Sequence, residues 1–224
     1  MPVRTVIERG PKGKRAVALS LDWIGWNRGA KSAEVALETM EAYRARYRPV
    51  TELAGMAAAF DEAGPIEVVE DRVGTGSVDF WGISFSASST EHEALAPDDI
   101  ERRITLLRAC WAFFDGVAGS VSATMQKGPR GGGRERDEII RHVRRVEILD
   151  FAGSLGLVVP DDYELISANL ADLREQYVAL MRAYNAGEVT KRMRSRTLPF
   201  LIRHTAFHTL DHAWEMQDKD LGAA

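Results

Sequence analysis

Three of the five histidines in the 224-residue chain lie close together near its C-terminal end. His204, His208 and His212 are four residues apart, so in a helix they lie within about 80° of one another on one face. Imidazoles one helical turn apart can bind the same metal ion. His204 and His212 would be separated by roughly 12 Å of helix rise, too far for two bonds of about 2 Å. The spacing therefore predicts a metal-binding pair, either His204 with His208 or His208 with His212.

A third metal ligand has to come from another part of the chain, and His142 is the natural candidate. Helical periodicity places it on one apolar face with Ile139, Val146 and Leu149. Burying an unpaired polar group costs about 1–3 kcal/mol, so this imidazole needs a partner. Three neutral imidazoles leave a coordination position open, which is typical of catalytic metal sites. The alternative interpretation is that these are hydrogen-bonded core histidines. The fifth, His92 in Glu-His-Glu, is expected at the surface.

Two acidic residues flank the same face of the C-terminal helix. Asp211 and Glu215 could orient the histidine ligands or serve as a general base. The alternative is that they form a solvated helix edge.

A glycine-rich segment, Gly128-Pro-Arg-Gly-Gly-Gly-Arg134, precedes a predicted helix N-terminus. Free backbone amides attract anions there, so Arg130 and Arg134 could hold a carboxylate of an anionic cofactor. The segment lacks Gly-Lys-Ser/Thr and therefore is not a P-loop. A simple turn between helices is the alternative interpretation.

The first ninety residues predict a small α+β unit. Its expected elements are a hairpin of residues 3–8 and 15–22, a loop at 23–29, a helix at 31–47, a shorter helix at 50–62, a strand at 66–73 and a loop or irregular segment at 74–93. Ser32 is the expected N-cap of the first helix, and Pro49 is expected to stop it. Trp23 and Trp26 lie in the predicted loop, where exposed tryptophans would mark a domain or dimer contact.

From Pro97 onward the apolar residues recur at helical intervals. Four amphipathic helices are predicted, at 97–121, at 135–155, between Pro160 and Gly187, and at 198–218. Four such helices with modest connections are what an antiparallel four-helix bundle needs. We therefore expect an α+β protein with two domains: a small α/β module at 1–93 and a four-helix bundle at 94–224.

The histidine pattern resembles that of a known family. His142 followed five residues later by Glu147, and then His208-x-x-x-His212, is similar to the DinB/YfiT-type metalloenzyme superfamily, over roughly Pro97–Asp218. The resemblance implies a four-helix bundle with zinc or nickel bound by His142, His208 and His212. It adds Glu147 to Asp211 and Glu215 as candidate catalytic residues. This chain has Ala213-Trp-Glu where His-Arg-Gly-Gln is the commoner ending.

Relatives with known activities include bacillithiol-dependent S-transferases and a mycothiol-dependent maleylpyruvate isomerase, and many members are dimers. The resemblance thus implies a metal-dependent hydrolase or a thiol-dependent transferase or isomerase acting on a small-molecule substrate, with a low-molecular-weight thiol as a further cofactor and a possible homodimer. Residues 18–43 also resemble a HicB-like hairpin-plus-helix unit known from antitoxins. That gives a non-catalytic alternative: a binding or regulatory protein whose metal site is structural or vestigial.

Composition narrows the function classes further. With 29 Lys and Arg against 33 Asp and Glu, the net charge of -4 excludes a generally basic, nucleic-acid-coating protein. No apolar run approaches the roughly 18 residues of a membrane span. The single cysteine, Cys110, excludes an internal disulfide and is expected as an inert core thiol. We expect a cytoplasmic protein with no nucleic-acid or membrane partner, in which any thiol chemistry uses a small-molecule thiol.

Overall fold

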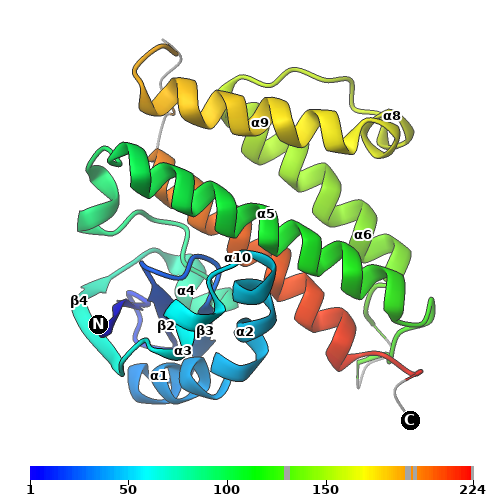
Figure 1. Cartoon of the computed structure of the whole chain (residues 1–224). Coiled ribbons are helices and arrows are strands. Elements are labelled where there is room, and N and C mark those ends of the chain that lie inside the picture. The colour runs from blue at the N-terminus through cyan, green and yellow to red at the C-terminus, as the bar shows by residue number, and fades with distance from the viewer. Residues whose placement is uncertain (129–131, 190–192, 194–195, 223–224) are drawn as a thin grey trace.

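The computed structural model describes residues 1–128, 132–189, 193 and 196–222. It is an α+β structure, as the sequence predicts: a sheet formed by the N-terminal part of the chain is followed by a long series of helices (Figure 1). The sheet has the strand order β3-β2-β1-β4 and is mixed, because β1 pairs antiparallel with β2 but parallel with β4. The strands are β1 (Val3–Arg9), β2 (Ala16–Ser20), β3 (Asn27–Ala30) and β4 (Ile66–Val73).

The predicted hairpin and the strand at 66–73 are confirmed, whereas the predicted loop at 23–29 is wrong in its last residues. Asn27 to Ala30 form β3, which pairs antiparallel with β2. Gly29 is the reason why this strand is not evident from the sequence. A Cβ there would lie 2.2 Å from the carbonyl oxygen of Gly82, so close packing requires glycine where strand periodicity favours a branched side chain.

The first helical region starts where the sequence predicts but does not end there. Ser32 caps α1 (Ala33–Ala42) by accepting a hydrogen bond from the Val35 amide. The chain breaks at Tyr43 and continues as α2 (Arg44–Leu53), which contains Pro49. The expectation that Pro49 stops the helix is therefore wrong. Tyr47 and Val50 on either side of it are fully buried, and this packing outweighs the backbone hydrogen bond that proline removes.

Three short helices complete the N-terminal part. They are α3 (Ala57–Asp61), α4 (Gly76–Trp81) and the 3-10 helix η1 (Ser89–His92). The last two lie within the segment that the sequence predicts as a loop or irregular edge, and they are only six and four residues long.

The C-terminal part contains the long helices. Its elements are α5 (Pro97–Ser120), α6 (Arg136–Arg145), the π-helix η2 (Val146–Ala152), α7 (Gly153–Leu155), α8 (Tyr163–Ala168), α9 (Leu170–Asn185) and α10 (Leu198–Asp218). Helix α10 packs along α5 and also contacts α6 and α9. In Figure 1 the sheet unit lies below α5, where the C-terminal part of α10 also runs, and α9 lies above α5.

The π-helix corrects the predicted inward face of the helix at 135–155. A straight α-helix would bury Val146 and Leu149, but both are partly exposed. Instead Glu147, Ile148 and Phe151 are buried. A π-turn contains an additional residue, so the side chains after it are rotated relative to a 3.6-residue period. Ile139 is buried as expected, because it precedes the π-turn.

One hydrophobic cluster runs through both parts of the chain. It includes Ile7 and Trp26 from the sheet unit together with Trp111, Leu201 and Trp214 from the long helices. Residues 1–93 and 94–224 therefore share a core. Cys110 is also buried in this core, which raises the pKa of its thiol.

Trp23 and Trp26 are buried, so the expectation that they are exposed is wrong, but Trp23 does contact the C-terminal part, because the guanidinium of Arg102 on α5 lies 4.6 Å from its ring centroid. Trp26 donates its indole N–H to the Met40 carbonyl at 2.8 Å and stacks on Tyr47. Trp23 packs edge-on against Phe60. Among the described residues, no helix combines the length and apolar character needed to cross a membrane.

Candidate metal centre

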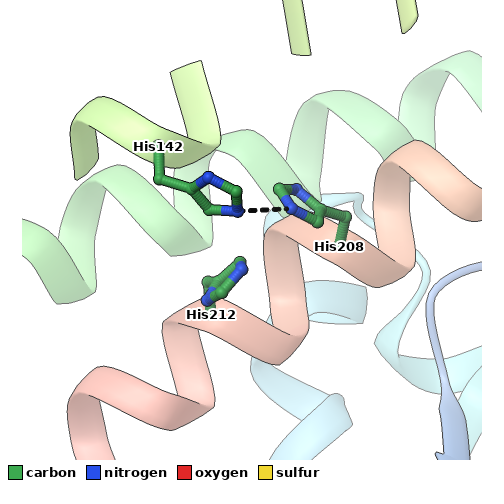
Figure 2. Close-up of side chains that lie close together, drawn as sticks. All are labelled: His142, His208 and His212. Atoms are coloured by element: carbon green, nitrogen blue, oxygen red, sulfur yellow. Dashed lines mark hydrogen bonds between the residues drawn. The ribbon is translucent and has the colours of Figure 1, made fainter. Parts of the chain in front are cut away.

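Three histidines from two helices meet in one cluster (Figure 2). His142 lies in the last turns of α6, whereas His208 and His212 lie one turn apart on α10. Each offers a ring nitrogen, and the three nitrogens lie within 4.8 Å of one another. The Nε2 atoms of His142 and His208 are 3.2 Å apart. Of the two pairs that the spacing allows, the structure selects His208 with His212 and adds His142 from across the helix interface.

The histidines of the cluster are partly buried, and for His142 and His208 this favours the neutral form. Burial, together with the neighbouring His212, lowers the pKa of His142 to about 4. Burial lowers the pKa of His208 further, to about 2, because both other histidines of the cluster also oppose its protonation. A neutral imidazole keeps a lone pair on one nitrogen, which is the form that binds metal ions.

Glu215 determines which nitrogen of His212 faces the cluster. Its carboxylate lies 2.6 Å from Nδ1 of His212, and this hydrogen bond lowers the pKa of Glu215 to about 2. An ionised carboxylate only accepts hydrogen bonds, so Nδ1 carries a proton and Nε2 is the ring nitrogen that this hydrogen bond leaves available. Lys219, one turn further on, pairs with the second carboxylate oxygen at 2.5 Å. Glu215 thus has the ligand-orienting role that the sequence offers as one of its alternatives.

His204 lies outside the cluster. It is 3% exposed and is surrounded by aromatic rings, with Phe200 stacked on it at 5.2 Å and Phe85 at 4.8 Å. Burial lowers the pKa of His204 to about 3. His204 is therefore a neutral core histidine, consistent with the helix geometry that separates it from His212. His92 is exposed, as expected.

Asp211 is adjacent to His212 in sequence, but its side chain contacts a residue outside the cluster. Its carboxylate pairs with Nη1 of Arg28 at 3.2 Å. The Arg28 guanidinium lies against two aromatic rings, 3.9 Å from the centroid of Tyr43 and 4.3 Å from that of Trp214. Arg28 comes from β3, so this contact joins the sheet unit to α10 beside the cluster. Arg28 is far away in the sequence, and no local pattern there indicates the contact.

Glu147 is buried in an ion-pair network. Both of its oxygens accept hydrogen bonds from Arg174, at 2.8 and 3.1 Å, and Arg174 also donates to Asp115 at 2.7 Å. Burial raises the pKa of Glu147 despite the charge of Arg174. Among the described contacts of Glu147, none is to a histidine of the cluster. The π-turn turns this carboxylate towards Arg174 on α9 and leaves it bound there.

The glycine-rich segment is described only in part. Arg130 lies outside the described residues. Arg134 is exposed just before α6, and its charge contributes to lowering the pKa of both His142 and His208. The Lys219 ammonium lies beside Gly133 in the same segment. Two cations therefore flank the cluster. Lys219 is a residue that sequence reasoning missed, although the Glu215–Lys219 spacing of four residues is a helix-pairing signal.

Comparison with known proteins identifies no relative of this chain: no family model, curated protein or solved structure matches it.

Proposed function

We propose that the chain is a divalent-metal-dependent enzyme whose ion is bound by His142, His208 and His212. The observation that carries this proposal is the convergence of three imidazole nitrogens from α6 and α10 within 4.8 Å. A tetrahedral ion with metal–nitrogen bonds of about 2.1 Å holds neighbouring nitrogens about 3.4 Å apart. The 3.2 Å between Nε2 of His142 and Nε2 of His208 is close to that spacing. The donor set therefore fits zinc or nickel, for which imidazole is a suitable ligand.

The protonation of the cluster supports the same assignment. His142 and His208 have lowered pKa values, so neither needs to release a proton near neutral pH before it binds an ion. The Glu215–His212 hydrogen bond is of the carboxylate–histidine type that orients metal ligands. Three protein ligands would leave a position for a substrate, as catalytic sites require.

The arrangement of the long helices is compatible with the proposed family. Helices α5, α9 and α10 and the continuous segment α6–η2–α7 supply four long helical segments, the number in a DinB-type bundle. The resemblance in sequence between residues 97–218 and that superfamily gives the same proposal. The HicB-like resemblance of residues 18–43 concerns the sheet unit alone.

The chemistry follows from the ligands and their neighbours. When bound, the ion acts as a Lewis acid that lowers the pKa of a water or thiol, which suits hydrolysis or thiol-dependent transfer or isomerisation. Glu215 keeps the Nδ1 proton on His212 and thereby fixes the orientation of the ring. Arg134 beside the cluster favours a substrate with an anionic group. Cys110 is fully buried, so any thiol would have to be a small co-substrate.

Elemental analysis of protein purified without a histidine tag tests this proposal. The expected result is about one equivalent of zinc or nickel per chain, lost in His208→Ala and kept in the control His92→Ala. Metal that persists in His208→Ala, or no metal after incubation with either ion, contradicts the proposal. Activity is then sought with a panel of esters and low-molecular-weight thiols. Stoichiometric metal without turnover on any of them would favour the non-catalytic alternative.

A further inference from the structure

The exposed aromatic residues of the chain are concentrated on α4 and the segment that follows it. Phe80, Trp81 and Phe85 are 74%, 59% and 42% exposed. Every other Phe and Trp side chain among the described residues is buried or partly buried. The three rings form one group, because Phe80 and Trp81 pack edge to face with centroids 4.9 Å apart and Phe85 lies 6.2 Å from Trp81.

The fold holds this group in place. Asp79 on α4 accepts hydrogen bonds from the backbone amides of Lys12 and Lys14, at 2.7 and 2.8 Å, and so fixes α4 to the turn between β1 and β2. At the end of α4, the Gly82 backbone packs directly on Gly29 of β3. Exposed aromatic rings on a fixed support bind a partner without a large loss of conformational entropy.

Three cations lie on the turn between β1 and β2, beside the rings. Lys12, Lys14 and Arg15 are all exposed, and none of them forms an ion pair within the part of the chain that the structure describes. The guanidinium of Arg15 lies close to Gly82, directly after Trp81. Most other exposed arginines have a carboxylate partner, for example Arg9 with Asp71 and Arg182 with Glu101. The Asp79 carboxylate lies at the same turn and offsets part of this charge, so three cations face one carboxylate and the turn keeps an excess of positive charge.

We infer that Lys12, Lys14, Arg15, Phe80, Trp81 and Phe85, here called the aromatic–basic patch, bind an acidic segment of a partner protein that carries an apolar side chain. The apolar side chain packs against Phe80 and Trp81, and neighbouring carboxylates pair with the cations of the turn. Buried aromatic anchors with arginine are the residues that contribute most to protein–protein binding. Charge complementarity with the turn selects an acidic partner over a basic one.

Two other anionic partners fit the patch less well. Single-stranded nucleic acids stack their bases on open ring faces, whereas the edge-to-face packing of Phe80 and Trp81 covers part of those faces. An anionic membrane is a wide surface that faces one whole side of the molecule, and the net charge of -4 opposes its approach over a Debye length of about 8 Å. A short acidic segment contacts only the local patch.

The test is a selection of random displayed peptides of about a dozen residues on the full-length protein, with counter-selection on the variant Phe80→Ala/Trp81→Ala. The expected peptides combine Asp or Glu with a Trp, Phe or Leu. Synthetic versions should bind wild type and lose about tenfold or more in affinity with that variant and with Lys12→Glu/Lys14→Glu. The matched controls are Leu165→Ala, an exposed apolar residue on α8, and Arg108→Glu, an exposed cation on α5. Neither should change the affinity.

Circular dichroism of each variant verifies that the fold is retained. Peptides that bind the patch variants as tightly as wild type, or the absence of any acidic–apolar enrichment, overturns the inference. Binding of oligodeoxythymidylate or of phosphatidylserine vesicles that depends on the same residues, in place of peptide binding, overturns it as well. The inference does not depend on the metal, because the patch contains none of the three histidines.

Discussion

The Nε2 atoms of His142 and His208 lie 3.2 Å apart although the two residues are 66 positions apart in the sequence. Two neutral imidazoles at this distance either share one hydrogen bond or bind a common cation. The carboxylate of Glu215 fixes the third ring by accepting a hydrogen bond from Nδ1 of His212. The cluster is thus arranged around one point from two helices, and its properties can be tested ligand by ligand.

Replacing His142 separates the metal-site interpretation from that of a simple histidine pair. His142→Ala leaves two ligands on α10. Residues that only orient ligands typically change metal affinity about 10- to 100-fold, and we expect the affinity for Zn²⁺ to fall by more than that. Competition with a chromogenic chelator measures the change. His92→Ala is the matched control, because it removes an exposed histidine outside the cluster. Equal affinities of the two variants would argue against His142 as a ligand.

Glu215 and Asp211 are acidic residues on the same helix with different contacts, and comparing them tests the orienting role. In Glu215→Gln the carboxylate that holds the Nδ1 proton is lost, so we expect Zn²⁺ affinity to fall about 10- to 100-fold. Asp211→Asn makes the same change of charge, but Asp211 contacts Arg28 and not a histidine. The Zn²⁺ affinity of Asp211→Asn should stay within about threefold of that of wild type, because Asp211 acts on the cluster only through a long-range charge. Isothermal titration calorimetry of both variants decides between a specific hydrogen bond and a general electrostatic effect.

The buried pair of Glu147 and Arg174 predicts a large effect on stability. In Arg174→Met the Glu147 carboxylate stays buried without its main partner, and breaking such a pair costs about 3–5 kcal/mol. The double variant Glu147→Leu/Arg174→Met removes both charges and should recover much of that loss. Urea denaturation of the metal-free protein measures the free energy of unfolding. If the double variant is as unstable as the single one, uncompensated burial of charge is not the cause.

The sequence predicts more of the candidate site than of its surroundings, for physical reasons. His208 and His212 share a face because α10 is a regular helix of 21 residues, which the apolar periodicity reveals. The π-turn after His142 depends on tertiary packing, so a 3.6-residue period assigns the wrong inward residues to that helix. The contact between Arg28 and Asp211 joins residues 183 positions apart and leaves no local pattern. Likewise, the shared core that buries Trp23 and Trp26 becomes evident only when the sheet packs against the long helices.

Because His204 is buried in its neutral form, we predict that it makes the stability of the fold depend on pH. Its pKa is lowered from 6.5 to about 3 by burial, so between these values the unfolded chain binds the proton and the folded chain does not. Stability should therefore fall as the pH decreases below about 6.5, by up to about 1.4 kcal/mol per pH unit from this group. His204→Gln removes the titration but keeps an amide. We expect the free energy of unfolding, measured with urea between about pH 4 and pH 6 on metal-free protein, to depend less steeply on pH in this variant. Because His142, His208 and Glu91 titrate in both proteins, the difference in slope isolates His204, and identical slopes would show that it is already protonated or solvated in the folded state.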